Sequence, residues 1–92
     1  MQEKYTTIEE AEESKVKAES TARRAIFDMA KAWEDSGDIY QATTTYKDLF
    51  EEAPETPEGQ GAKEGLLRIA ESYRKEGATH SALLLYKYMM GV

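Results

Sequence analysis

The sequence contains no cysteine, one histidine and two prolines in 92 residues. The lack of cysteine excludes disulfides and thiolate metal sites, and it leaves the redox compartment open. No run approaches the 18 apolar residues of a membrane-spanning helix, and the acidic N-terminus lacks the character of a signal peptide. Together these absences make the cytoplasm the default expectation for location.

Basic residues are also few, with 12 lysines and arginines against 18 aspartates and glutamates, for a net charge of −6. Binding to phosphate backbones draws most of its affinity from lysine and arginine. Attraction to an anionic membrane surface depends on the same residues. We therefore expect no nucleic acid and no membrane among the partners. The length suffices for one small domain with a limited core.

Side chains that could carry chemistry are scarce. His80 has no cysteine and no carboxylate partner on its own helical face, which favours a surface histidine over a metal ligand or general base. No base accompanies Ser36, Ser72 or Ser81. The Gly59-Gln60-Gly61 segment lacks the strand and trailing lysine of a phosphate loop, so we interpret it as flexibility at a helix entry. We expect no enzyme activity, no catalytic residue, no cofactor and no metal.

What the sequence does contain is an internal repeat with a period of 40 residues. Ala30, Trp33, Gly37, Ala42 and Tyr46 return as Ala70, Tyr73, Gly77, Ala82 and Tyr86. A fixed period of this size is typical of helical repeat arrays. In such a unit the glycine takes the left-handed conformation that ends the first helix. The alanines lie where the two helices cross closely.

This pattern resembles the tetratricopeptide repeat family, in which a bulky residue, a glycine, an alanine, an aromatic and a closing proline follow in order. Pro54 stands where that family closes a repeat, and the resemblance extends from Ala22 to Met90. It implies an all-α fold of two helix-turn-helix repeats, which together form a fragment of an α-solenoid. It also implies protein binding as the function.

The expected organisation is an acidic N-terminal extension over residues 1–20, helical or partly disordered, followed by a two-repeat domain over residues 21–92. We place the repeats at 21–55 and 56–92. A capping box formed by Thr6 with Glu9, or by Thr7 with Glu10, would start the extension as a helix.

Within the first repeat, the leading helix should run to about Ser36. Its apolar face is predicted to contain Ile26, Met29, Ala30 and Trp33, which recur at helical spacing. Asp38 should cap the second helix, and Thr56 followed by Pro57 should start the third. Three glycines, at positions 59, 61 and 65, would weaken that third helix by about 1 kcal/mol each if they are interior.

Charges at equivalent positions of the two leading helices have opposite signs. In the tetratricopeptide family these helices lie side by side and line a concave groove. The pairs therefore predict a ladder of ion pairs: Arg24–Glu64, Asp28–Arg68, Lys31–Glu71, Glu34–Arg74 and Asp35–Lys75. Each exposed pair contributes only about 0–1 kcal/mol, so the ladder would mainly set the register. Arg68 should face Asp28, which argues against clamping of a peptide carboxylate.

The last helix is apolar on nearly all sides. Three leucines occupy the positions where the first repeat has three threonines, and Tyr88 replaces Asp48. Packing against the preceding helix would bury Ala82, Tyr86, Met89 and Met90. A helix this apolar is normally covered, either by the next helix of a longer array or by a homodimer or docked partner. The predicted interface consists of Leu83, Leu84, Leu85, Tyr88 and Met89.

The leading hypothesis is a non-catalytic scaffold for protein–protein interaction. It would act as a homo-oligomer, or as a small subunit of a larger assembly, through this apolar helix. The alternative is a peptide-binding receptor that uses the concave groove. The residues predicted to line that groove are Arg24, Asp28, Lys31, Asp35, Glu64, Arg68, Glu71, Arg74 and Lys75.

Overall fold

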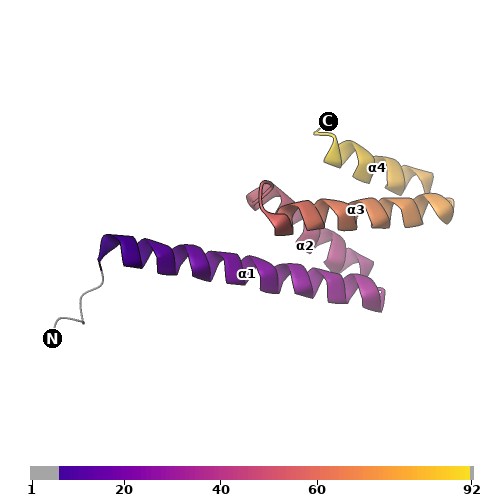
Figure 1. Cartoon of the computed structure of the whole chain (residues 1–92). Coiled ribbons are helices and arrows are strands. Elements are labelled where there is room, and N and C mark those ends of the chain that lie inside the picture. The colour runs from indigo at the N-terminus through magenta and orange to yellow at the C-terminus, as the bar shows by residue number, and fades with distance from the viewer. Residues whose placement is uncertain (1–6, 92) are drawn as a thin grey trace.

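The computed structural model describes residues 7–91, and every regular element in that range is a helix. The helices are α1 (Ile8–Ser36), α2 (Ile39–Glu52), α3 (Pro57–Lys75) and α4 (Thr79–Met89). Consecutive helices run antiparallel, so α1 and α2 form one hairpin and α3 and α4 form a second (Figure 1). The prediction of an all-α fold is confirmed. The first six residues of the predicted extension lie outside the described range.

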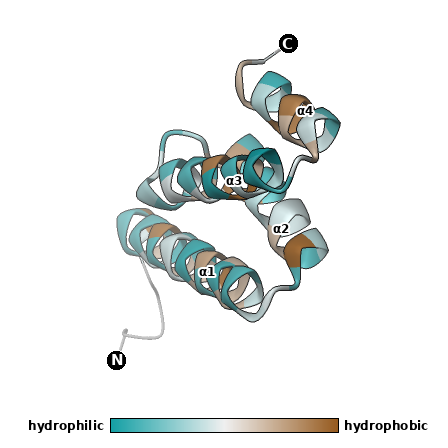
Figure 2. Cartoon of the chain, turned by 90° about the vertical axis from the view of Figure 1, so that its right-hand side faces the viewer, coloured by the Kyte–Doolittle hydropathy of each residue, from teal (hydrophilic) through white to brown (hydrophobic). Residues whose placement is uncertain are grey.

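The four helices stack into an elongated array that measures 66 × 29 × 15 Å. α2 packs against α1 and α3, while α3 also contacts α1 and α4. In both views α1 lies at one end of the array and α4 at the other (Figures 1 and 2). Within the described residues, one side of the second hairpin therefore has no helix beside it.

The start of α1 is fixed by the second of the two predicted capping boxes. The Thr7 hydroxyl accepts a hydrogen bond of 3.0 Å from the Glu10 amide, and the Glu10 carboxylate accepts one of 3.3 Å from the Thr7 amide. From Ile8 to Ser20 the chain is helical and every residue is exposed. This half of α1 projects past the two hairpins as a single helix (Figure 1).

The two hairpins turn in the same way. Gly37 and Gly77 have φ angles of 89° and 86°, the left-handed conformation predicted for both. In each turn the amide that follows the glycine donates to the carbonyl four positions before the glycine, at 2.9 Å and 2.8 Å. The period of 40 residues is therefore also a period in the backbone hydrogen bonds of the turns.

The predicted caps of α2 and α3 are present. The Asp38 carboxylate accepts from the Gln41 amide at 3.2 Å, and the Thr56 hydroxyl accepts from the Gly59 amide at 3.0 Å. Pro57 occupies the first turn of α3, where its missing N–H leaves no hydrogen bond unmade.

The glycines of α3 permit close packing, so the prediction of flexibility at the helix entry is wrong. A Cβ atom at Gly59 would overlap the carbonyl oxygen that follows α2, and one at Gly61 would lie 2.7 Å from the Phe27 ring. A Cβ atom at Gly65 would overlap the ring of Tyr46. The low helix propensity of glycine is accepted here because a side chain would push α3 away from α1 and α2.

The core lies between the helices and contains the repeated alanines, as predicted. Its buried members are Ala30, Ala42, Tyr46, Leu49, Ala62, Leu66, Ile69, Ala70, Ala82 and Leu85. The predicted face of α1 is wrong in part, because Ile26 and Met29 are 39% and 50% exposed while Phe27 packs against the core. The reason is that α1 is the end of the array, so only the side that faces α2 and α3 is covered.

Candidate protein-interaction surface

The predicted ion-pair ladder is wrong in its register. None of the five predicted pairs occurs between residues 7 and 91. Arg24 pairs instead with Asp28 on its own helix at 3.5 Å, and Arg74 pairs with Glu71 three positions earlier on α3. The ion pairs that do join α1 to α3 are Glu34–Arg68 at 2.9 Å and Arg23–Glu58 at 3.6 Å.

Three contacts define the true register between α1 and α3. Arg68 lies 34 positions after Glu34, and Gly61 lies 34 positions after Phe27. The third pair, Arg23–Glu58, has almost the same spacing. The helices are thus staggered by six residues relative to the 40-residue period, a shift of about 9 Å along the axis. Close contact at the α3 glycines sets this stagger.

One carboxylate joins three helices. Glu34 accepts two hydrogen bonds of 2.9 Å from Arg68 on α3 and one of 2.6 Å from the buried Tyr46 on α2. The hydrogen bonds from Arg68 and from Tyr46 lower the pKa of Glu34, although burial acts in the opposite direction. Burial and the bond to Glu34 raise the pKa of Tyr46. This arrangement joins α1, α2 and α3 through one carboxylate.

The same three residue types meet again in the second hairpin, with one difference. Tyr86 on α4 donates a hydrogen bond of 3.1 Å to Glu71 on α3, and Glu71 also pairs with Arg74. The bond from Arg74, followed by that from Tyr86, lowers the pKa of Glu71. Here the arginine comes from the same helix as the acid, because within the described residues no further helix follows.

Four of the nine predicted groove residues pair with one another, as Arg24–Asp28 and Glu71–Arg74. Arg68 binds Glu34 rather than Asp28, so its expected partner is corrected. A hollow on the open side of the second hairpin is lined by Leu67, Arg68, Glu71, Ser72, Lys75 and Tyr86. Its arginine and its acid are both engaged within the chain, which leaves Lys75 as the basic side chain of the hollow that makes no ion pair among the described residues.

The predicted interface on α4 is only partly exposed. Leu83 and Leu84 are 44% and 55% exposed, whereas Leu85 is buried at 5%. Met89 is half-buried and packs against the core, while Met90, which was predicted to be buried, is 68% exposed. The cause is a rotation of α4 about its axis relative to the prediction.

Tyr88 fixes that rotation. Its hydroxyl donates to the carboxylate of Glu51 at 2.6 Å and to the carbonyl of Lys47 at 3.3 Å, both on α2. Its ring packs edge-on to Phe50, with the ring centroids 6.3 Å apart. Tyr88 is therefore an internal contact between hairpins, and the expectation that it lies in an exposed interface is wrong.

The uncovered apolar surface of the second hairpin, called the end face below, consists of Leu67, Leu83, Tyr86 and Met90. The three residues of α4 recur at helical spacing on one side, and Leu67 lines the same hollow as Tyr86. α4 as a whole lies at the edge of the array in Figure 2, and part of its ribbon is hydrophobic. Sequence reasoning missed Leu67 and Met90, although the repeat gave a signal, since they are the equivalents of Phe27 and Phe50.

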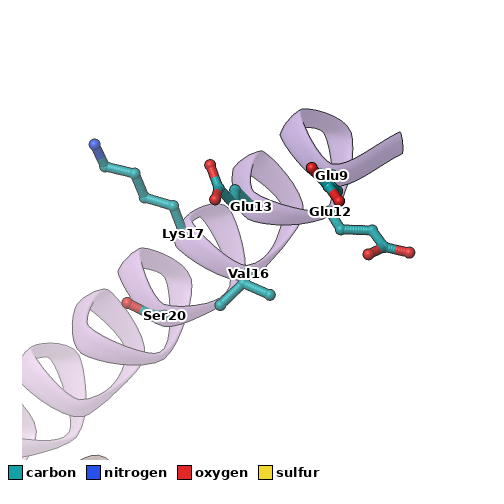
Figure 3. Close-up of a pocket in the computed structure, with 6 residues that line it drawn as sticks. All are labelled: Glu9, Glu12, Glu13, Val16, Lys17 and Ser20. Carbon is teal, nitrogen blue, oxygen red and sulfur yellow. The ribbon is translucent and has the colours of Figure 1, made fainter. Parts of the chain in front are cut away.

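The free half of α1 carries the other open surface. Figure 3 shows that the residues around its shallow hollow all belong to one helix: Glu9, Glu12, Glu13, Val16, Lys17 and Ser20. No second element closes it among the described residues, so it is an acidic helix surface rather than a binding cavity.

Over residues 7–91, no group of three histidines, cysteines or acids comes close enough to hold a metal ion. Nor does that range contain a helix of sufficient length and apolar character to cross a membrane. Comparison with family models, curated proteins and solved structures finds no match to the chain.

Proposed function

We propose that the chain is a tetratricopeptide-like module of two repeats that acts as a non-catalytic scaffold and binds protein through its end face. The partner is a second copy or another subunit of an assembly. The observation that carries the proposal is the contrast between equivalent positions of the two hairpins. Tyr46 is fully buried under α3, whereas its equivalent Tyr86 is only half-buried.

The other positions of the end face follow the same contrast. Thr43 and Phe50 are half-buried, and their equivalents Leu83 and Met90 are 44% and 68% exposed. The second hairpin thus keeps large side chains at the positions that a following helix would cover, and there Leu83 replaces Thr43. Burial of each large apolar side chain would contribute about 1.5–3 kcal/mol before the costs of association. Repeat proteins usually place polar residues on a terminal helix that stays exposed.

Peptide binding in the groove remains the second candidate, and the hollow beside Tyr86 is what favours it. The end face is the better candidate because Leu67, Leu83 and Met90 are 42%, 44% and 68% exposed in the described chain. A peptide terminus would have to compete with the pairs Glu34–Arg68 and Glu71–Arg74.

The proposal is tested by replacing Leu83 and Met90 together with aspartate and measuring mass by sedimentation over a range of concentrations. We expect the mass of the wild type to rise with concentration and that of the double variant to stay at the monomer value. Circular dichroism should report equal helix content, since both side chains are exposed. Equal masses for the two proteins at every concentration would contradict self-association through this surface.

A further inference from the structure

We infer that the occupant of the end face is α1 of a second copy of this chain, docked head to tail as α3 docks on the first hairpin. The inference rests on the proposed function and goes further, because it names the partner and its register. It follows from the contacts that α3 and α4 make with the first hairpin. In each contact, both residues are replaced by their equivalents 40 positions away in the repeat.

The template is the internal contact between α1 and α3. Phe27 touches Gly61, and Glu34 binds Arg68, each pair separated by 34 positions. The α1 residue of each pair has its equivalent 40 positions later, on α3 of the first copy. The α3 residue of each pair has its equivalent 40 positions earlier, on α1 of the second copy. Each internal contact therefore specifies one contact of the junction between copies.

The charges of the junction are complementary. The equivalent of Glu34 is Arg74, and the equivalent of Arg68 is Asp28. Both signs are reversed, so Arg74 of one copy meets Asp28 of the next as an ion pair of opposite polarity. Both residues are exposed, and among the described residues each forms an ion pair with a neighbour on its own helix. Opposite charges at a docking surface favour one register over others.

A second internal contact gives a second complementary pair. The Lys47 ammonium lies 4.8 Å from the centre of the Tyr88 ring. The equivalents are Lys87 on α4 of the first copy and Asp48 on α2 of the second, and both are exposed. A contact between a cation and an aromatic ring within the chain thus becomes a contact between a cation and a carboxylate at the junction.

The shapes of the junction residues also match at one tight point. Gly61 has no side chain because the Phe27 ring fills the space. Their equivalents are Thr21 and Leu67, so a residue with a Cβ atom faces a shorter side chain than phenylalanine. The volume added on one side is removed on the other.

At a second tight point the aromatic ring has to move. Gly65 lies against the ring of Tyr46, and the equivalents are Ala25 and Tyr86. The methyl group of Ala25 would displace the Tyr86 ring from the position that Tyr46 occupies. Tyr86 is half-buried rather than fully packed, so its ring has room to turn. This point makes the junction weaker than the internal contact.

The second copy also brings an apolar surface that lacks a cover. Leu66 and Ile69 of α3 are buried, at 0% and 3% exposure, where α3 meets the first hairpin. Their equivalents on α1, Ile26 and Met29, are 39% and 50% exposed. Docking would cover these two residues and the end face together, which are the apolar surfaces at the two ends of the array.

The end face and the α1 surface differ, so a docked pair of copies still has one free end face and one free α1 surface. Such a heterologous contact does not close into a dimer and adds copies in a row unless the rotation forms a ring. Growth of mass with concentration beyond that of a dimer is therefore the expected behaviour.

The test exchanges the charges of the junction between two single variants. Arg74→Glu and Asp28→Arg should each stay monomeric where the wild type associates, because each places like charges at the junction. An equimolar mixture should recover association, since each variant then presents a complementary face to the other. We expect the mean mass of the mixture to exceed that of either variant by at least about twofold at the same total concentration. Asp35→Arg is the matched control, because that position lies past the end of α3 in this register.

Each outcome of the experiment decides the inference. Recovery in the mixture, with wild-type behaviour of the control, supports head-to-tail docking. Association that depends on Leu83 and Met90 but is unchanged by either charge variant overturns the inference and leaves the proposed function standing. A discrete dimer that does not grow, or a wild type that stays monomeric, also overturns it.

Discussion

Arg68 on α3 donates two hydrogen bonds of 2.9 Å to the carboxylate of Glu34 on α1, which lies 34 positions earlier in the chain. Glu34→Gln should lower the free energy of unfolding by about 1–3 kcal/mol, because a charged acceptor shared by three helices is replaced by a neutral amide. Urea denaturation measures this change. Asp35→Asn, at the exposed neighbouring position, is the matched control and should stay within about 0.5 kcal/mol. Equal effects of the two substitutions would show that the pair does not hold α1 to α3.

The same carboxylate should make stability depend on pH. Because its hydrogen bonds lower the pKa of Glu34 in the folded chain, its contribution is complete above the unfolded pKa near 4.5 and is lost as the pH falls through the folded value. Between about pH 6 and about pH 3, the wild type should lose more stability than Glu34→Gln. The difference between the two urea-denaturation series isolates this one group from the other acids. Parallel curves would contradict the assignment.

Packing at the α3 glycines predicts that a second substitution can partly reverse the destabilisation caused by a first. Gly61→Ala should destabilise the fold by about 1–3 kcal/mol through overpacking, against a gain of about 1 kcal/mol in helix propensity. The new Cβ atom would lie 2.7 Å from the Phe27 ring, so adding Phe27→Leu should recover part of the loss. Thermal denaturation of the two single variants and the double variant gives the coupling energy. Strictly additive changes would mean that α3 does not approach α1 at this position.

The rotation of α4 gives opposite expectations for two adjacent leucines. Leu85→Ala should lower the free energy of unfolding by about 2–5 kcal/mol, because it leaves a cavity in the core. Leu84→Ala, at a position that is 55% exposed, should stay within about 0.5 kcal/mol. Chemical denaturation of the two variants compares them directly. Small and equal effects of the two substitutions would instead match the orientation expected from the sequence, in which both leucines are exposed.

Local chemistry in the sequence was enough to predict the helices and their ends. The left-handed glycines and the caps at Asp38 and Thr56 depend on residues a few positions apart. Each of these features follows from backbone geometry or from the spacing of a single helix.

The register between helices could not be predicted in this way. The ladder assumed that equivalent residues of α1 and α3 lie side by side, but contacts of Gly61 and Gly65 with aromatic rings stagger the helices. Likewise, the choice between Leu84 and Leu85 as the buried residue depends on Tyr88 reaching α2. Both outcomes are set by contacts between segments far apart in the chain, which a repeat pattern does not encode.

The position of the contact surface is tested by cross-linking two single-cysteine variants, since the native chain has no cysteine. Leu67→Cys lies on the end face, and Thr21→Cys lies on the α1 surface that should meet it. Treatment of their mixture with a short bismaleimide should give a covalent heterodimer. Leu84→Cys mixed with Thr21→Cys should give none, because Leu84 lies off the end face. Equal yields from the two mixtures, or cross-linking of Leu67→Cys mainly to itself, would contradict docking of α1 on the end face.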